Sequence, residues 1–360
     1  MVSRAQPRRH HPDRLALALH PSQRFRNVTS PAVTTVVVVH GSGAATVRAC
    51  VQSLLDSVGV DMFVVLVDNA SPDAGAACAP WLGHQRVRVI TAARNGGFAA
   101  GVNIGLGHRR RSDLICLLND DATVEPSTIA RCVDALGDDA SVIAVAPRVM
   151  LADQPDLIDS IGVVVRPNAE AFNAFIGQPW AAQVANGADV LGPCFGAAVF
   201  RSDAFDSTAV GPLDERYRLY YEDIDWALRA RRMGLRTIAV TDAVVFHQHA
   251  ASTRLLGEPT RYELVQRNLL LCASKNFPAA AAVRVWCSRL VVHAKGIIKG
   301  PYRAQRISAI ARALWGLPSA LLARRHLPRQ RITDDAALFA YATGLEPNFN
   351  TDTYRAGTNS

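Results

Sequence analysis

The sequence predicts an α/β fold, in which a mostly parallel sheet carries helices on both faces and a helical appendage follows toward the C-terminus. Three observations predict it. Apolar runs of strand length alternate with segments of helical periodicity. A polar cluster follows several of these runs, at the point where each strand should end. From residue 279 to residue 332 the chain is rich in apolar and basic residues and contains no acid.

Five apolar runs are predicted strands. They are rich in valine and isoleucine, as strands buried on both faces of a sheet are. In chain order they are "TTVVVV" (34–39), "MFVVLVDN" (62–69), "RVRVITA" (86–92), "SDLICLLNDD" (112–121) and "SVIAVAPRV" (141–149). Strands that alternate with helices form parallel units, so we expect these strands to end at the same edge of the sheet.

Helices are predicted between these strands. The segment 45–57 places Val47, Val51 and Leu54 at helical spacing. The segment 97–109 is expected to be a helix that begins at the pair Gly96-Gly97. The segment 125–139 has a proline near its start and a glycine near its end, where each is favoured in a helix.

Charge is distributed unevenly along the chain. The total is +8, but residues 1–30 carry +5, residues 279–332 carry +11 and residues 333–360 carry −3, which leaves −5 for residues 31–278. We expect 1–30 to be a disordered basic arm, 31–278 the main α/β domain, 279–332 a basic amphipathic helical region and 333–360 a flexible tail. Because the main domain is not basic, no nucleic-acid partner is expected.

The basic helical region has two interpretations. Helices that mix Trp286 and Leu290 with Arg284 and Lys295 can lie in the headgroup layer of an anionic membrane. The alternative is a helical pair packed on the main domain.

The seven cysteines include no C-x-x-C pair, which predicts buried thiols in a reducing compartment. We therefore expect a cytoplasmic protein, peripheral on the inner face of the cell membrane.

Polar side chains follow the second and third predicted strands. Asp68 and Asn69 end the second strand, and a carboxylate there can accept hydrogen bonds from a nucleobase or ribose; the alternative is an ordinary turn. Asn95, Gly96 and Gly97 follow the third strand and let backbone approach a phosphate at a helix N-terminus; the alternative is close helix packing. Their spacing is not G-x-G-x-x-G, which disfavours a nicotinamide oxidoreductase.

The fourth strand ends in "NDD". Asn119 and Asp121 are two residues apart, so on an extended segment they point to the same side. Paired oxygen ligands suit Mg²⁺ or Mn²⁺, which proteins usually bind through one or two carboxylates plus substrate phosphates. The sequence therefore predicts a site for a metal-bound diphosphate here, and the alternative is a polar strand terminus.

Three acids lie among aromatic residues in "LYYEDIDWALRARRMG" (219–234). An ionised acid beside apolar groups is costly unless a partner compensates it. The acids either stabilise the first turn of a helix or act on a substrate. We expect Asp225 to have a structural role and Glu222 and Asp223 to act on a substrate. Trp226 is expected to lie in the core.

Taken together, these motifs resemble the inverting glycosyltransferases of family 2, which have the GT-A fold, and are most similar to the bacterial rhamnosyltransferase-like branch. The resemblance covers about residues 34–278. The motifs that carry it are "VVVV", "VDNASPD", "NGGFAAGVNIG", "LLNDDATV", "GPCFGAAVFR", "LDERYRLYYEDIDWALRARRMG", "VFHQHAAST" and "RYELVQRNLLLCASKNFP". Two positions depart from the family pattern: residues 40–42 read His-Gly-Ser instead of a Thr-Tyr-Asn-like triplet, and the D-x-D position begins with Asn119.

The resemblance implies transfer of a sugar, with rhamnose favoured, from a dTDP- or UDP-linked donor to a hydroxyl of a cell-envelope glycan or lipid-linked glycan, with Mg²⁺ or Mn²⁺ as cofactor. It implies that Asp223 is the catalytic base, with Glu222 beside it. It implies metal binding by Asp121 and His247, although His247 is equally suited to the core or the acceptor side. The residues implied to bind the nucleotide-sugar are His40, Asp68, Asn69, Asn95, Gly96, Gly97, Asn103, Asn119 and Asp120. A homo-oligomer is possible, and the alternative function is a catalytically silent nucleotide-binding or scaffold protein of the same fold.

Overall fold

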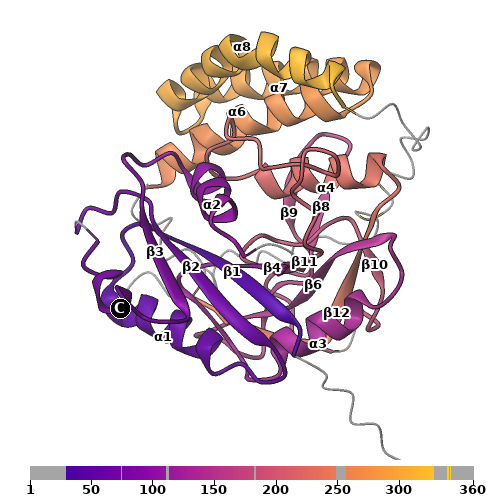
Figure 1. Cartoon of the computed structure of the whole chain (residues 1–360). Coiled ribbons are helices and arrows are strands. Elements are labelled where there is room, and N and C mark those ends of the chain that lie inside the picture. The colour runs from indigo at the N-terminus through magenta and orange to yellow at the C-terminus, as the bar shows by residue number, and fades with distance from the viewer. Residues whose placement is uncertain are drawn as a thin grey trace, which may run out of the picture. The chain divides into compact units, whose positions relative to one another are not determined.

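A mixed sheet of ten strands organises the structure (Figure 1). The structure is a computed structural model that describes residues 30–73, 75–110, 113–181, 184–248, 257–327, 339 and 341. The described residues from Pro31 onward belong to one compact unit. The predicted basic arm and flexible tail lie outside the described residues, apart from residues 30, 339 and 341, and stay predictions.

Four neighbouring strands of the sheet are parallel, as the sequence predicted. Their order is β3 (Val87–Thr91), β2 (Asp61–Asp68), β1 (Ala32–Val39) and β4 (Leu114–Leu118). Every pairing among them is parallel. Both faces of β1 and β2 are buried, which explains their unbroken apolar runs.

The other half of the sheet contains a strand that the sequence analysis missed. β11 (Ala197–Phe200) lies between β4 and β6 (Val142–Leu151) and is antiparallel to both. Since two antiparallel steps restore the direction, β6 runs parallel to β4, and β12 (Arg236–His247) is parallel to β6. The carboxyl ends of these strands therefore share one edge of the sheet with the start of β11.

The remaining strands are short. β5 (Ala122–Val124), β7 (Ile158–Ser160) and β10 (Asp189–Val190) pair antiparallel with β12 or β6. β8 (Val163–Val165) and β9 (Ala171–Asn173) form a separate hairpin.

Helices cover both faces of the sheet, as predicted (Figure 1). On one face, α1 (Ala44–Leu55) and α3 (Thr128–Leu136) bury their apolar sides in the same core cluster. On the other face, α2 (Phe98–Gly107) and α4 (Glu222–Arg232) pack into a second cluster, which contains the fully buried Trp226. The 3-10 helix η1 (Ala79–Trp81) follows β2.

Three long helices complete the described chain: α6 (Glu258–Asn276), α7 (Ala279–Lys299) and α8 (Arg303–Arg325). The second half of α6 is buried in a third cluster that it shares with α4 and with small residues of α7 and α8. The helical region is therefore packed on the main domain, while its outer faces remain exposed. No helix in the described ranges has the length and apolar character needed to cross a membrane.

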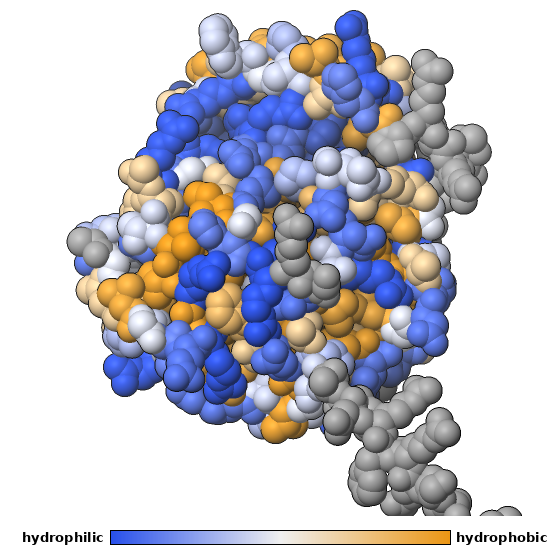
Figure 2. Space-filling view, viewed as in Figure 1, coloured by the Kyte–Doolittle hydropathy of each residue, from blue (hydrophilic) through white to orange (hydrophobic). Residues whose placement is uncertain are grey.

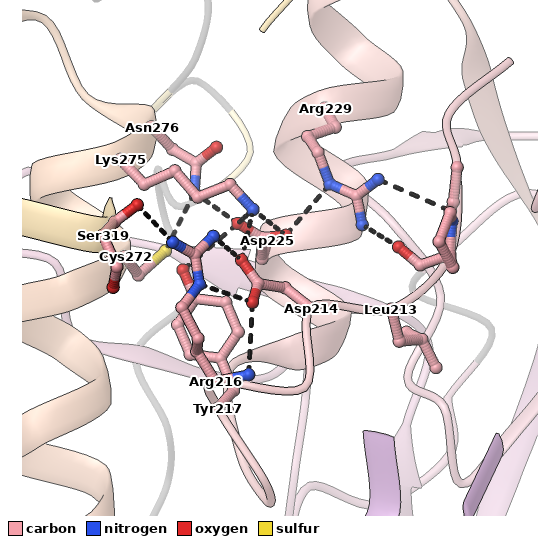
Figure 3. Close-up of polar contacts among 12 residues, drawn as sticks. Leu213, Asp214, Arg216, Tyr217, Asp225, Arg229, Cys272, Lys275, Asn276 and Ser319 are labelled. Carbon is pink, nitrogen blue, oxygen red and sulfur yellow. Dashed lines mark hydrogen bonds and ion pairs between the residues drawn. The ribbon is translucent and has the colours of Figure 1, made fainter. Parts of the chain in front are cut away.

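A buried ionic cluster joins α4 to α6 (Figure 3). Asp225 is fully buried, and its carboxylate contacts Arg229 at 2.9 Å, Lys275 at 2.8 Å and Asn276 at 2.8 Å. Lys275 also contacts Asp214 at 2.7 Å. Burial alone would raise the pKa of Asp225, but the charges of Lys275 and Arg229 lower it. Asp225 is thus an ionised structural residue, as the sequence predicted.

Candidate active site

The loops that follow β1, β2 and β3 are tied together by amide side chains. Asn69 donates hydrogen bonds to the side-chain oxygen of Asn95 (3.2 Å) and to the carbonyl of Gly97 (3.1 Å). The backbone of Gly96 donates in turn to Asn69 (3.3 Å). The amide nitrogen of Asn95 lies 2.9 Å from His40 Nε2. Predicted binding residues from three strand ends therefore meet at the shared edge.

Gly97 shows why glycine is needed in this loop. Its φ is +89°, and it precedes the first residue of α2. A Cβ atom at this position would clash with the backbone of Arg218, so the loop packs directly on the chain that leads into α4. This close packing is the alternative that the sequence left open, and Asn95 beside the loop remains exposed.

Asp68 and Asn103 lie near this group, and their side chains form hydrogen bonds within the protein. Asp68 is buried, accepts a hydrogen bond from the backbone of Ser71 (2.8 Å) and leaves room only for glycine at position 75. Asn103 exchanges hydrogen bonds with the backbone of Leu213 (2.9 and 3.0 Å) and donates to Glu215 (3.0 Å). Both side chains have these structural partners, and their contact with a nucleotide-sugar stays a prediction.

The acidic loop after β4 faces the end of β12. His247 Nε2 lies 2.9 Å from Asp121 and 3.2 Å from the amide nitrogen of Asn119, so both side chains point to the same side, as expected. His247 Nδ1 lies 2.6 Å from Asp159, which is buried in β7. Burial alone would lower the pKa of His247, but the carboxylates of Asp121 and Asp159 raise it to about 10. The imidazolium thus bridges two carboxylates.

A protonated imidazole has no lone pair for a metal ion. In this arrangement His247 orients Asp121, and its predicted role as a metal ligand stays a prediction. Among the described residues, no group of three or more His, Cys, Asp and Glu side chains is arranged to enclose a metal ion. A divalent cation held here would therefore take its remaining ligands from substrate and water.

Asp120 provides the structural test of whether these residues fit such a cation. Its side chain is buried, and its Oδ2 has no hydrogen-bond partner within the described part of the chain. Burial and the nearby charge of Asp121 raise its pKa to about 7. Two adjacent carboxylates, one of them with an unsatisfied oxygen, fit a magnesium or manganese ion that bridges to phosphate oxygens.

Within the described part of the chain, Glu222 and Asp223 at the start of α4 have no cationic partner of the kind that Asp225 has. Glu222 is buried, and its Oε2 has no hydrogen-bond partner among the residues described. Burial and the charge of Asp223 raise the pKa of Glu222 to about 8. Asp223 is partly exposed; burial raises its pKa, whereas backbone N–H groups that donate to it, among them that of Ile224 at 2.8 Å, lower it. Glu222 therefore keeps its proton longer, and Asp223 is the acid that ionises first.

Cys194 lies between the two acidic regions. Burial raises the pKa of its thiol, and the charges of Asp223 and Asp159 raise it further. Gly196, at the start of β11, is close to both the sulfur of Cys194 and the amide of Asn119. Asp223 and Asp159 thus both act on Cys194, and Asp159 contacts His247, which in turn contacts Asp121. Such an arrangement can place a partly exposed base opposite a diphosphate held at the strand ends.

The first part of the chain is similar to known proteins. Residues 34–167 match the family model described as Glycosyl transferase family 2. Succinoglycan biosynthesis protein ExoO of Rhizobium meliloti (strain 1021) is 34% identical over 141 residues, which are 39% of this chain. The chain spans 38% of the length of that curated relative.

Three solved structures have a similar fold. Mannosyltransferase PcManGT from Pyrobaculum calidifontis, in complex with GDP-Man and Mn²⁺, has a TM-score of 0.50 and 18% identity, covering 80% of this chain and 88% of its own. S. aureus TarS 1-349 with UDP-GlcNAc has a TM-score of 0.51 and 14% identity, covering 81% and 83%. GalNAc-T7 with UDP, GalNAc and Mn²⁺ has a TM-score of 0.51 and 15% identity, covering 60% and 43%. The predicted fold class is confirmed, and the matched domain supports a glycosyltransferase.

Sequence reasoning missed two residues of this glycosyltransferase-like site. Asp159 lies on a strand of only three residues, and nothing in "LIDSIG" indicates that its carboxylate meets His247, 88 positions away. Cys194 was noted only as part of a stretch of small residues. The segment 249–256, which contains part of the "VFHQHAAST" motif, lies outside the described residues.

The raised pKa of Glu222 predicts a specific dependence of stability on pH. Its folded pKa, about 8, lies above the value of 4.5 expected in the unfolded chain, so the folded state binds more protons between these values. The free energy of unfolding contributed by Glu222 should therefore fall as pH rises from 5 to 8. We expect Glu222→Gln to remove this fall, on the order of a few kcal/mol, in urea titrations at pH 5, 6.5 and 8.

The matched control for this experiment is Glu125→Gln, because Glu125 is exposed. It should leave the pH dependence unchanged. A Glu222→Gln variant that loses as much stability as the parent between pH 5 and 8 would show that Glu222 ionises normally.

Proposed function

We propose that this protein is an inverting glycosyltransferase that moves a sugar from a nucleoside-diphosphate donor to a hydroxyl of a cell-envelope glycan or lipid-linked glycan. The observation that carries the proposal is a partly exposed acid, Asp223, which has no cationic partner among the described residues and whose charge acts on Cys194 together with that of Asp159, the partner of His247. Together, Asp223 and the acidic loop after β4 provide a base on one side of a reacting carbon and a diphosphate site on the other.

On the donor side, Asn69 and Asn95 fix the glycine loop at the start of α2, where a helix N-terminus favours a phosphate. His40 and Asp68 are proposed to line the nucleoside. Asp120 and Asp121 would hold Mg²⁺ or Mn²⁺ against the diphosphate. When bound, the cation offsets the negative charge that develops on the leaving group. Mn²⁺ in the PcManGT and GalNAc-T7 structures supports this choice of cofactor.

On the acceptor side, Asp223 accepts the proton of the attacking hydroxyl. The new bond joins the acceptor oxygen to the anomeric carbon as the bond from that carbon to the phosphate oxygen breaks, and the nucleoside diphosphate leaves with the electron pair. Attack from the face opposite the leaving group inverts the configuration. A positioned general base contributes roughly 10²–10⁴-fold to such a step.

Glu222 assists by staying protonated. With its proton retained, it adds no second negative charge beside Asp223, so the ionised form of Asp223 is not further disfavoured. Two coupled acids with different pKa values, one buried and one partly exposed, are typical of a site where one performs proton transfer.

The donor proposed is a dTDP-sugar, with rhamnose favoured and UDP-sugars next. The support for it is the motif resemblance of the "ED" and "NDD" segments to the rhamnosyltransferase-like branch, while PcManGT and TarS were solved with GDP-Man and UDP-GlcNAc respectively. A donor screen that records release of nucleoside diphosphate from dTDP-, UDP- and GDP-sugars tests it. A catalytically silent scaffold would bind a nucleotide and release nothing from any donor.

We further propose that the outer faces of α7 and α8 dock on an anionic lipid surface. Residues 279–327 contain nine Lys and Arg and no acid. On α8, Ile307, Leu314 and Leu321 recur every seven residues and are about half exposed, and Trp315 is 90% exposed. Figure 2 shows orange and blue side chains mixed at the top of the view, where Figure 1 draws these helices.

The cations on these helices differ in exposure. Arg289 is buried and pairs with Glu170, whereas Arg312 pairs with Glu263 from a side chain that is 67% exposed. The other exposed cations of α7 and α8 are Arg284, Lys295, Lys299, Arg303 and Arg325. A surface that combines exposed apolar residues with positive charge matches an anionic bilayer interface, where both contributions favour binding. Docking there would place the enzyme next to a lipid-linked acceptor.

Asp223→Asn is expected to lower turnover by about two orders of magnitude or more while nucleotide affinity stays near normal, because the amide cannot accept the proton. Release of nucleoside diphosphate from the donor found in the screen measures turnover. Asp134→Asn, at an exposed position of α3, is the matched control and should keep full activity. Near-full turnover of Asp223→Asn would exclude it as the base.

Asp121→Ala is expected to abolish the Mn²⁺-dependent part of nucleoside-diphosphate binding, since it removes a carboxylate from the cation site. Calorimetry of dTDP and UDP binding with and without Mn²⁺ measures this, and Asp134→Ala serves as control. Identical isotherms for the parent protein in the presence and absence of Mn²⁺ would contradict the metal assignment.

The full chain is expected to sediment with phosphatidylglycerol vesicles at low salt and much less with phosphatidylcholine vesicles, because positive charge and apolar area act together. Trp315→Ala should reduce the bound fraction several-fold. Leu82→Ala, a change at a comparably exposed site remote in sequence, should have no effect. Absence of binding to anionic vesicles refutes the docking proposal, and self-association without vesicles would assign the face to a second copy.

A further inference from the structure

The chain that leads into α4 has an unfavourable backbone conformation. Arg218, Tyr220 and Tyr221 have φ values of 63°, 68° and 74°, a left-handed region that bulky side chains rarely adopt. Tyr221 is the N-cap of α4 and directly precedes Glu222 and Asp223. Such a conformation persists only where surrounding contacts enforce it, and it concentrates at functional sites.

One side chain supplies much of that enforcement. Asn268, on α6, is fully buried, and its amide nitrogen lies within hydrogen-bond distance of the carbonyls of Tyr217 (2.9 Å), Leu219 (2.9 Å) and Tyr220 (2.8 Å). Helix and sheet ladders offer these carbonyls no donor, because the segment belongs to neither. This amide is therefore shared among three carbonyls of the turn, whereas the carbonyl of Tyr217 also accepts from the backbone of Leu219 (2.7 Å) and that of Arg218 accepts from Ala99.

Asn268 is itself oriented by its neighbour in sequence. Arg267 Nη1 donates to the side-chain oxygen of Asn268 (2.7 Å) and to the carbonyl of Arg216 (2.8 Å). Because a cationic donor occupies the oxygen, the amide nitrogen must face the turn. The pair comes from "VQRNLLL", a motif that the proposed chemistry does not otherwise use.

The turn at 217–221 also contacts the donor-side loop. The backbone of Ala99 donates to the carbonyl of Arg218 (3.1 Å), and Gly97 packs against the backbone of Arg218. The turn is therefore in contact with the glycine loop at Arg218 and continues into the acids of α4 at Tyr221. Its shape sets how the Asp223 carboxylate lies relative to a donor held near Asn95.

We propose that Asn268 is a positioning residue, which holds the turn at 217–221 in its left-handed conformation and thereby fixes Asp223 for reaction. The proposal rests on the proposed function for its catalytic consequence, but its structural part is independent of that function. Asn268 does not touch the reacting atoms; it acts through the backbone of the turn.

The matched control is Asn276, an asparagine on the same helix that is also fully buried. Its amide donates to Asp225 (2.8 Å), which keeps Lys275 and Arg229 as partners when Asn276 is removed. Asn268→Ala and Asn276→Ala thus delete the same group at the same depth, but only Asn268→Ala deprives the turn of its donor.

Hydrogen–deuterium exchange of the full chain tests the structural part without any substrate. We expect amides of residues 217–223 to exchange at least about tenfold faster in Asn268→Ala than in the parent, with little change in this segment for Asn276→Ala. Unchanged exchange of residues 217–223 in Asn268→Ala overturns the proposal. This result is obtained whether or not the protein transfers a sugar, so it separates this inference from the proposed function.

Kinetics with the donor that the parent consumes test the catalytic part. We expect Asn268→Ala to lower kcat about 10- to 100-fold while KM for the donor changes less than about threefold, because Asn69 and Asn95 tie the donor loop independently. Asn276→Ala should keep kcat within about threefold even where its melting temperature falls equally. Equal losses of kcat in the two variants would reduce Asn268 to a stabilising residue and overturn the positioning role.

Arg267→Met provides a second route if Asn268→Ala does not fold. It removes the donor that orients Asn268 while leaving the amide in place, so exchange at 217–223 and kcat should shift in the same directions by smaller factors. Parent-like exchange and kcat in Arg267→Met would overturn the proposal. Failure of the parent to consume any nucleotide-sugar would refute the proposed function, and the exchange result would still decide whether Asn268 holds the turn.

Discussion

Whether a buried carboxylate has a cation beside it decides what that carboxylate does in this protein. Moving an ionised acid out of water is costly, and only a charged or hydrogen-bonded partner compensates the cost. Asp225 has Arg229, Lys275 and Asn276 and is fixed as an ion in the framework. Asp121 and Asp159 share the imidazolium of His247. Among the described residues, Asp120, Glu222 and Asp223 have no ion pair of this kind, and burial raises the pKa of each, so they are the acids assigned to the proposed chemistry.

The direction of the strands brings these acids together. Parallel strands β1 to β4 carry the amides and the acidic loop to one edge, and β12 delivers His247 to the same edge. β11 runs the opposite way, so its start, not its end, lies there and brings Cys194 and Gly196 into the site. One antiparallel strand in the middle of the sheet thus connects the diphosphate side to the helix that carries the proposed base.

Local pattern was sufficient to predict the parts of the structure that depend on local sequence. Unbroken valine runs identified β1 and β2, and the glycine pair identified the start of α2. The spacing of Asn119 and Asp121 predicted that both point to the same side, which the contacts of both with His247 confirm. Asp225 was correctly expected to be structural, because an acid in the first turn is stabilised by the helix dipole; its ion pair with Arg229 was not predicted.

Contacts between distant segments could not be predicted in this way. Asp159 meets His247 across 88 positions, and Asn268 meets Leu219 across 49, and neither spacing leaves a periodic signal. β11 was missed because four small and apolar residues have no strand length of their own and gain their partners only from β4 and β6. The family resemblance implied that Asn103 contacts the donor; the structure adds that its amide is bonded to the loop at Leu213, a contact that the sequence did not indicate.

The order of the segments along the chain has a consequence for how the site is completed during synthesis. The donor half is built from residues before 160, whereas the turn at 217–221 takes its backbone donor from α6, at residue 268. A nascent chain that has left the ribosome only as far as β12 already has every strand end, but the turn before α4 has no amide to satisfy it. On the proposed roles, such an unfinished chain binds a nucleotide-sugar. It does not hydrolyse the donor, because Asp223 is not yet fixed in place.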